Sequence, residues 1–396
     1  MVKKQNKINT LFLTRWYPHR YDPMPGLFVQ RHAEAIAMHC KVSLLYVHPD
    51  DKLKNDKKEI ITETINDVFT VRIYYRAVKS KIPFIGEIIK GFKYFNANRE
   101  GMKIISKERG KPDIIHVNIL TRLGLFAYLN KIISGVPFIV TEHWSRYLPI
   151  TNTYKGFARK FLTRIVVKNA SAITPVTKNL KNAMLHYNLK NNNYLILPNV
   201  VDIEIFKPVI IKHQNKKTKI IHVSCFEDQS KNISGILNVI KKLSEKRQDF
   251  ECYFVGDGID LKKLKNYADE LKIKDKFAIF TGLLEGEKLI DSINKSDLML
   301  LFSNYENMPV VINESFACGV PVISSNVGGI SEYVNTETGE LIERKDEKAL
   351  LNSLVNFLND NKKYDRGNIR EFAVKNFSKE AVSMKILNIY KSVLDR

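Results

Sequence analysis

Short apolar runs recur along the whole chain and are separated by polar or helical stretches. Most of them are rich in β-branched residues and end at Gly, Pro, Asn, Asp or His, which is typical of strands. Most are continuous rather than alternating, as expected for strands covered on both faces. The predicted strands are Ile8–Leu13, Val42–Val47, Val68–Ile73, Ile114–Val117, Phe138–Thr141, Ala172–Pro175, Tyr194–Leu197, Lys219–Val223, Phe250–Val255, Phe277–Thr281, Leu298–Phe302 and Val320–Ser324.

Helical periodicity lies between these runs, for example over Gly26–His39, Gly235–Lys246, Leu261–Leu271 and Glu285–Asn294. Alternation of strands and helices predicts parallel, doubly wound α/β sheets. Ligands of such sheets bind at the carboxyl ends of the strands. The fold class is therefore predicted to be α/β, with the functional residues in the loops that follow strands.

The chain divides into two such units. Pro198–Pro208 is a proline-bounded connector, a polar stretch follows it, and the strand pattern restarts at Ile220. About 150 residues per domain also suggests two domains for 396 residues. We therefore predict two Rossmann-like domains, residues 1–205 and 206–376, that face one another across a cleft.

Charge is distributed unevenly between the two predicted halves. The net charge is +21, of which residues 1–205 hold +18, from 33 basic and 15 acidic residues. The remainder holds +3, from 30 basic and 27 acidic residues. This imbalance indicates that the N-terminal half faces an anionic membrane surface, an acidic or phosphorylated acceptor, or nucleic acid. A general lysine bias explains the basicity but not the imbalance.

No apolar run reaches the roughly 20 residues that span a bilayer, and the basic N-terminus lacks the apolar core of a signal peptide. We expect a cytoplasmic protein. The segment Lys79–Lys111 interleaves lysines with Ile, Phe and Tyr. It suits either an amphipathic helix on the inner face of the membrane or a helix that packs on the sheet with a lysine-rich outer face.

The stretch Ser303–Val334 contains two glutamates, Glu306 and Glu314, eight positions apart. A buried strand is predicted to end just before it, and Pro309 stands where a helix over Val310–Cys318 begins. The free amides at such a helix start attract phosphate or hydroxyl oxygens. Ionised carboxylates only accept hydrogen bonds, so they suit sugar hydroxyls. Taken singly, each glutamate also suits a helix cap or a solvated surface.

The two glutamates match the E-x7-E motif of the retaining glycosyltransferases with the GT-B fold, and the chain resembles glycosyltransferase family 4 over almost its whole length. Further matches, in family order, are TRWYPHRYDPMPGLFVQRHAEAIA, DIIHVN, VPFIVTEHW, ASAITPVTKNLKNAM, PNVVDIEIFKP, HVSCFEDQSKN, FVGDGIDLKKLKNYADELKI, IFTGLL and GVPVISSNVGGISEYV. The resemblance implies a donor-binding C-terminal domain and an acceptor-binding N-terminal domain. It also implies that a final helix, about residues 377–396, packs back on the first domain.

The resemblance implies a role for each matching residue. Glu314 would accept from the nucleotide ribose, and Glu306 would contact the transferred sugar. Lys231 would neutralise the diphosphate, and His143 would hydrogen-bond a sugar hydroxyl near the reaction. The remaining donor contacts would come from Gly26, Leu283 and the amides of Met308, Pro309, Val310 and Val311.

One departure from the family pattern stands at Ser224-Cys225-Phe226, where family members carry an arginine that helps to bind the phosphates. Arg15, Arg31 or another cation substitutes for it, or Lys231 carries the charge alone. The sequence has no Asp-x-Asp motif and no His/Cys cluster at ligand spacing. We therefore expect no metal and no cofactor, with a nucleoside diphosphate sugar, preferably a UDP-sugar, as co-substrate.

These observations predict a retaining, metal-independent hexosyltransferase that acts on a saccharide or lipid-linked acceptor in cell-surface polysaccharide or glycolipid synthesis. The alternatives are a nucleotide-sugar epimerase or phosphorylase of the same fold, or an inactive donor-binding subunit. A nucleic-acid-binding protein fits less well, because no helix-turn-helix or RNA-binding signature is present.

Overall fold

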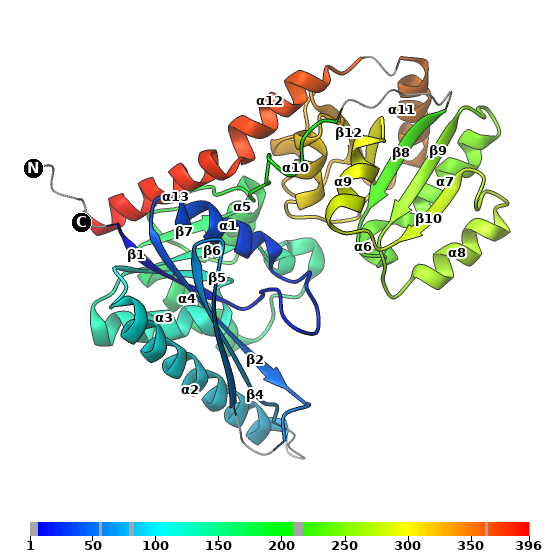
Figure 1. The fold of residues 1–396 in the computed structure, drawn as a ribbon. Helices are drawn as coiled ribbons and strands as arrows, with labels where there is room; N and C mark the ends of the chain where they lie inside the picture. The colour runs from blue at the N-terminus through cyan, green and yellow to red at the C-terminus, as the bar shows by residue number, and fades with distance from the viewer. Residues whose placement is uncertain (1–6, 55–57, 79–82, 210–216, 361–362, 396) are drawn as a thin grey trace, which may run out of the picture.

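The computed structural model describes residues 7–54, 58–78, 83–209, 217–360 and 363–395. Within these ranges the chain forms two parallel-stranded sheets flanked by helices (Figure 1). The first sheet contains β1 (Asn9–Thr14), β2 (Lys41–Asp50), β3 (Lys58–Ile65), β4 (Val68–Arg76), β5 (Ile114–Asn118), β6 (Phe138–Glu142) and β7 (Ala172–Pro175). The second contains β8 (Thr218–Val223), β9 (Phe250–Val255), β10 (Ala278–Gly282), β11 (Leu298–Leu301), β12 (Val322–Ser325) and β13 (Gly339–Ile342).

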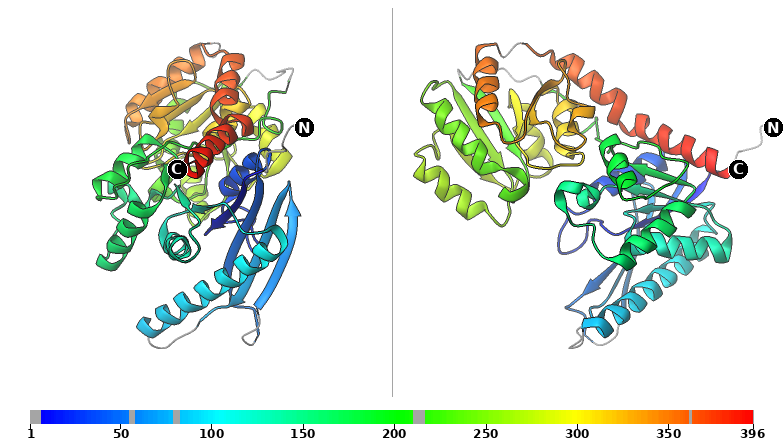
Figure 2. Two further views of the ribbon diagram at one scale, coloured as in Figure 1. Left: turned by 90° about the vertical axis from the view of Figure 1, so that its left-hand side faces the viewer. Right: turned by 180° about the vertical axis from the view of Figure 1, so that it is seen from behind.

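The helices connect successive strands and cover both faces of the sheets (Figures 1 and 2). In the first unit they are α1 (Leu27–Ala37), α2 (Pro83–Arg109), α3 (Thr121–Ser134), η1 (Ser145–Tyr147), η2 (Pro149–Thr151), α4 (Phe157–Asn169) and α5 (Lys178–His186). In the second they are α6 (Asp228–Lys231), α7 (Ile233–Ser244), α8 (Leu261–Glu270), α9 (Gly286–Asn294), α10 (Val310–Ala317), η3 (Ile330–Glu332), α11 (Glu347–Asn359) and α12 (Arg366–Phe377), with α13 (Lys379–Leu394) last.

The strand order is β3-β4-β2-β1-β5-β6-β7 in the first sheet and β10-β9-β8-β11-β12-β13 in the second. All paired strands are parallel except β3, which pairs antiparallel with β4. In both sheets the order reverses beside the first strand, β1 or β8, which is where doubly wound sheets bind ligands. The predicted α/β class with two Rossmann-like units is confirmed.

Three details differ from the sequence prediction. Strand β3 was not predicted because its residues alternate in burial, and its turn needs Asn66 and Asp67 in the left-handed region, with φ of 45° and 63°. Strand β13 was too short and polar to stand out. The predicted strand Tyr194–Leu197 is wrong. This segment runs beside β7 and bonds to Ile173 and Pro175, but it forms only one isolated bridge before Pro198 turns it away.

Helix α13 lies against the N-terminal unit, far from the unit that precedes it in sequence (Figures 1 and 2). It packs on α1 and buries Val382, Ile386 and Tyr390 among other side chains. The Tyr390 hydroxyl lies 2.7 Å from Nδ1 of His116 and 3.3 Å from Oγ1 of Thr10. The last helix therefore completes the core on one face of the first sheet. The predicted boundary at residue 205 lies in the connection between the two sheets.

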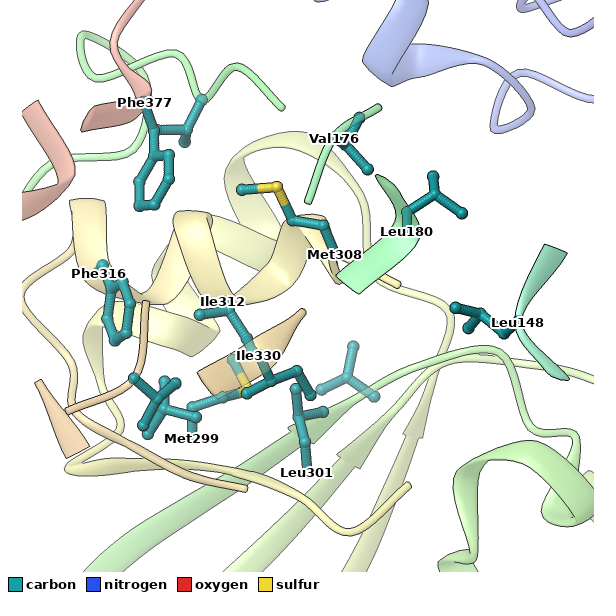
Figure 3. Packing of buried hydrophobic residues seen from close by; sticks show 14 of the residues in the cluster. Leu148, Val176, Leu180, Met299, Leu301, Met308, Ile312, Phe316, Ile330 and Phe377 are labelled. Atoms are coloured by element: carbon teal, nitrogen blue, oxygen red, sulfur yellow. The ribbon is translucent and has the colours of Figure 1, made fainter. Parts of the chain in front are cut away.

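Apolar packing continues from one unit into the other. One cluster of buried side chains includes residues of both sheets. Figure 3 shows Met308, just before α10, between Ile312 of that helix and Val176 and Leu180 of the N-terminal unit. The loops after β7 and β11 therefore meet across the cleft. Among the residues that the structure describes, no helix combines the length and apolar character needed to span a bilayer.

Candidate functional site

The loop after β11 holds an ion pair at the cleft. Nζ of Lys231, the last residue of α6, donates to Oε1 of Glu306 over 2.6 Å. Oγ of Ser303 donates to the same oxygen over 2.8 Å. Burial opposes the charged form of Lys231, but the adjacent carboxylate outweighs it, so the pKa of Lys231 is raised. The lysine therefore remains cationic at neutral pH, close to the start of α10.

Glycine is required behind this loop. Gly328 has φ of 62°, a conformation that side chains other than glycine rarely adopt. A Cβ at this position would lie 2.0 Å from the carbonyl oxygen of Glu306. The Gly328-Gly329 turn that follows β12 thus lets the glutamate loop lie directly against it.

The opposite wall of the cleft is built on His143, which follows β6. Its ring packs on Phe28 of α1 with the two ring centroids 4.4 Å apart. Burial, followed by the neighbouring His32 and His116, holds the pKa of His143 well below its usual range, so the imidazole is neutral. Both ring nitrogens are buried and meet no hydrogen-bond partner within the described part of the chain. A neutral imidazole of this kind suits a bound hydroxyl group.

Asn307 connects the two walls. Its Nδ2 donates to the backbone oxygen of His143 over 2.8 Å, and Oγ1 of Thr177 donates to its Oδ1 over 3.0 Å. Asn199 adds a second bridge by donating to the Met308 carbonyl oxygen over 3.2 Å. These bonds fix the glutamate loop of one unit against the histidine loop of the other.

A third bridge caps a helix across the cleft. The carboxylate of Glu332 accepts from the backbone amides of Lys178 and Asn179, each over 2.8 Å. These amides open α5, where a carboxylate is favoured by the free N–H groups and the helix dipole. The second unit therefore satisfies polar backbone groups of the first.

Between the walls lies a cavity of about 420 Å³. Both units contribute to its lining, which consists of Trp16, Phe28, His143, Trp144, Ser145, Val176, Asn199, Cys225, Glu227, Ser230, Lys231, Tyr305, Glu306, Asn307, Met308 and Val310. One side is aromatic and the other carries the ion pair. This combination suits a sugar whose ring needs apolar contact and whose hydroxyls and phosphates need polar partners.

Five of the predicted site residues line this cavity together: His143, Lys231, Glu306, Met308 and Val310. They come from both units and, apart from Lys231 at the end of α6, follow a strand or begin a helix, which agrees with the expected position of a ligand in doubly wound sheets.

The other predicted residues lie outside the cavity lining. Glu314 is held by an ion pair with Arg31 of the opposite unit over 2.9 Å. Leu283 is 52% exposed in the loop after β10, and Pro309 occupies the cap position of α10 rather than its first turn, while Val311 follows within the helix. Gly26 caps α1 with φ of 77°, and a Cβ there would lie 2.1 Å from the Trp16 carbonyl oxygen.

Sequence reasoning missed Asn307, which joins the two units, and the tryptophan pair of the N-terminal wall. Asn307 stands directly beside Glu306, but nothing in the pattern showed that it would reach the other unit. Trp16 and Trp144 lie in segments that match the family, but no role was assigned to either of them. Their rings lie 5.2 Å apart in an edge-on arrangement. A contact between two domains, such as that of Asn307, leaves no periodic pattern in the sequence. The tryptophans could have been noticed, because the chain has only two and both follow predicted strands.

Two Rossmann-like units with a shared cavity at their strand ends define the GT-B class of glycosyltransferases. Residues 27–205 match the family model described as Glycosyltransferase Family 4, and residues 204–371 match Glycosyl transferases group 1. The chain belongs to these glycosyltransferases, of the family 4 type.

Relatives extend over most of the chain. An uncharacterized glycosyltransferase of Methanocaldococcus jannaschii is 27% identical over 87% of this chain and 92% of its own length. The UDP-Gal:alpha-D-GlcNAc-diphosphoundecaprenol alpha-1,3-galactosyltransferase of Escherichia coli is 27% identical over 65% of this chain and 69% of its own length.

Solved structures show the same fold. Sucrose-phosphate synthase from Thermosynechococcus elongatus superimposes with a TM-score of 0.77 at 18% identity, over 98% of this chain and 99% of its own. Anabaena HepE in complex with UDP and glucose gives a TM-score of 0.72 at 15% identity, over 97% and 100%. The GT-B architecture expected from the resemblance is confirmed.

The contact between the units can be tested at Gly329. A Cβ there would lie 2.1 Å from Cγ2 of Thr177, so Gly329→Ala is expected to lower the free energy of unfolding by about 1–3 kcal/mol through overpacking. Adding Thr177→Ser removes Cγ2 and keeps the hydroxyl that caps α5, but Cβ of residue 177 stays 2.6 Å away, so only part of the loss should be restored. Urea unfolding measures both. Gly91→Ala, where nothing lies within 4 Å, is the matched control. Equal stability of the wild type and Gly329→Ala would contradict the contact.

Proposed function

We propose that this protein is a retaining hexosyltransferase that moves a hexose from a nucleoside diphosphate sugar to a hydroxyl group of its acceptor. The observation that carries the proposal is the Lys231–Glu306 pair at the start of α10, which faces His143 across one cavity. A cation and free amides suit a diphosphate, whereas a carboxylate and a neutral imidazole suit sugar hydroxyls.

Lys231 has the charge needed for the leaving group. Lys231 remains cationic while buried. When the phosphates of the donor accept hydrogen bonds from its ammonium group, Glu306 can accept hydrogen bonds from sugar hydroxyls. The amides at the start of α10 would add partial positive charge beside the phosphates. We favour a UDP-sugar as the donor, which is supported by the fold likeness to HepE, whose structure contains UDP and glucose.

The lining of the N-terminal wall bears on how a retaining transfer would proceed. This wall consists of Trp16, Phe28, His143, Trp144, Ser145, Val176 and Asn199, with no carboxylate among the described lining residues. A covalent intermediate would need a nucleophile there. We therefore propose attack on the same face. The bond from the anomeric carbon to the phosphate oxygen breaks, the acceptor oxygen bonds to that carbon, and its proton passes to the departing phosphate.

The acceptor is proposed to be a saccharide or a lipid-linked sugar of a cell-surface polysaccharide or glycolipid. The name of the E. coli relative gives a sugar on diphosphoundecaprenol as that enzyme's acceptor. Peripheral contact with the inner face of the membrane fits such an acceptor.

Helix α2 is the proposed contact surface. Ile85, Ile88, Ile89 and Phe92 follow the spacing of one helical face, and all four are exposed, Phe92 by 68%. The outer end of α2 projects from the N-terminal unit (Figure 1). Part of the predicted segment, Lys79–Ile82, lies outside the described residues.

Product analysis tests the reaction. With a UDP-hexose and an acceptor, the new glycoside should have the same anomeric configuration as the donor, as measured by NMR coupling constants. An inverted product would rule out the mechanism. An epimerised nucleotide sugar would favour the epimerase alternative, and a sugar phosphate formed from inorganic phosphate and a glycoside would favour the phosphorylase. A UDP-induced thermal shift without any product would indicate an inactive subunit.

Lys231→Ala should lower kcat by about 10²–10³, because one stabilising donor is removed from the departing diphosphate. Its melting temperature should fall far less than its turnover. Steady-state kinetics and thermal unfolding measure the two effects. Lys217→Ala is the matched control, since that lysine is exposed and pairs with Glu251 in the same unit. Unchanged turnover in Lys231→Ala would remove the leaving-group role.

Membrane contact predicts that the protein sediments with vesicles of phosphatidylglycerol and phosphatidylcholine. Phe92→Ser should weaken this binding about tenfold, because burying a phenylalanine contributes roughly 1.5–3 kcal/mol. Ile133→Ser, an 84% exposed position on α3, should not change it. Equal sedimentation of Phe92→Ser and wild type would exclude α2 as the contact surface.

A further inference from the structure

Two arginine side chains lie over one tryptophan at the edge of the cavity. Cζ of Arg146 is 3.5 Å from the centroid of the Trp144 ring, and Cζ of Arg15 is 4.9 Å from it. Trp144 itself lines the cavity between the two units. The loops after β1 and β6 thus bring two cations onto Trp144 of the N-terminal wall, while the arginines themselves are not among the residues that line the cavity.

Arg146 has unused hydrogen-bonding capacity. It lies in η1, is partly buried, and its Nε has no hydrogen-bond partner among the described residues although the atom is fully shielded from solvent. A buried N–H without a partner costs free energy unless a ligand or water accepts from it. The nitrogen is covered in this arrangement, so a ligand acceptor would reach it only after the partly exposed Arg146 side chain shifts.

Positive charge accumulates at this point. Burial is the main reason why the pKa values of Arg15 and Arg146 are lowered, and Arg159 of α4 lowers both further by repulsion. Cations brought together in this way favour the binding of an anion, which relieves their repulsion.

The carboxyl group of Glu142, the last residue of β6, attracts both arginines and thereby opposes the lowering of their pKa values. Its two oxygens accept backbone amides of Leu120, His143 and Trp144 over 2.9–3.0 Å. Burial raises the pKa of Glu142 to about 7. The carboxyl group is therefore only partly ionised at neutral pH and compensates the two guanidinium charges incompletely.

The sequence around Arg146 is also rich in basic residues. Residues 143–201 contain nine Lys and Arg residues and no Asp or Glu. This interval covers the loop that carries Arg146, the whole of α4 and α5, and the connector up to Val201. This interval therefore holds +9 of the net charge of +18 of the N-terminal half.

We propose that Arg146, with Arg15 and Trp144, forms a subsite that binds an anionic group of the acceptor, a phosphate or a carboxylate, next to the hydroxyl that is glycosylated. The inference rests on the proposed function and specifies its acceptor. A planar guanidinium matches the oxygens of either group with two parallel hydrogen bonds, and stacking on tryptophan keeps its plane fixed. The two sources are a glycosyl or prenyl diphosphate and a hexuronic acid.

Tryptophan fluorescence reads this site directly, because the only two tryptophans of the chain, Trp16 and Trp144, lie in contact. With UDP present at saturation to fill the donor side, the protein is titrated with geranyl diphosphate, glucuronate and glucose. At least one anion should bind ten times more tightly than glucose. Arg146→Gln should raise the Kd of that anion at least tenfold while the UDP-induced thermal shift is retained. The anion that binds identifies the source of the charge.

Arg164→Gln is the matched control, because Arg164 is an exposed arginine on α4 that does not contact the tryptophans. It should leave all three titrations unchanged. The proposal is overturned if neither anion binds better than glucose, or if Arg146→Gln binds the anion as well as wild type does. Absence of any UDP or GDP thermal shift, with anion binding intact, would instead count against the donor side of the proposed function.

Discussion

The hydrogen bonds of Asn307 with the N-terminal unit are the constraint on which the site depends. The two sheets have separate strands, so nothing in their ladders fixes the distance between His143 and Glu306. Asn307 fixes it by binding the His143 carbonyl oxygen and the Thr177 hydroxyl at the same time. Its neighbour Glu306 then points its carboxylate to Lys231 rather than across the cleft. This amide, together with the bridges of Asn199, Glu332 and the Arg31–Glu314 pair, therefore positions the chemistry of both walls.

The electrostatics of the donor side follow from a residue exchange in the loop after β8. At the position where the resemblance implies an arginine, this chain has Cys225, which is exposed and lines the cavity. Its neighbour Phe226 is buried and packs on Phe280 with the two ring centroids 6.2 Å apart. A Cβ at Gly258 would lie 2.6 Å from the Phe226 nitrogen. Phe226 therefore fixes the loop against the core, while Cys225 supplies no positive charge to the cavity. Arg31 pairs with Glu314, so the proposed stabilisation of a diphosphate is assigned to Lys231 and the amides of α10.

The sequence predicted what depends on local patterning. Continuous apolar runs gave eleven of the thirteen strands, since a strand covered on both faces has few polar positions. The alternating strand β3 escaped because it is partly exposed at a sheet edge. At the site, the loop position of Glu306 followed from the predicted strand and helix on either side of it, whereas His143 and Lys231 were identified through the family resemblance. The ion pair of Glu314 did not, because its partner Arg31 is almost 300 residues away and in the other unit.

The chain crosses between the units twice, and the two crossings meet. The backbone amide of Val201, in the first connection, donates to the carbonyl oxygen of Phe377 over 2.9 Å. Ser378, directly after it, begins α13 and accepts from Ala381. Two connections bonded at one point resist separation of the units but leave rotation about that point possible. The cavity is closed elsewhere, by Asn307 and by the cap that Glu332 places on α5. The bonds that complete the site are thus the ones that a rotation of the two units would break first.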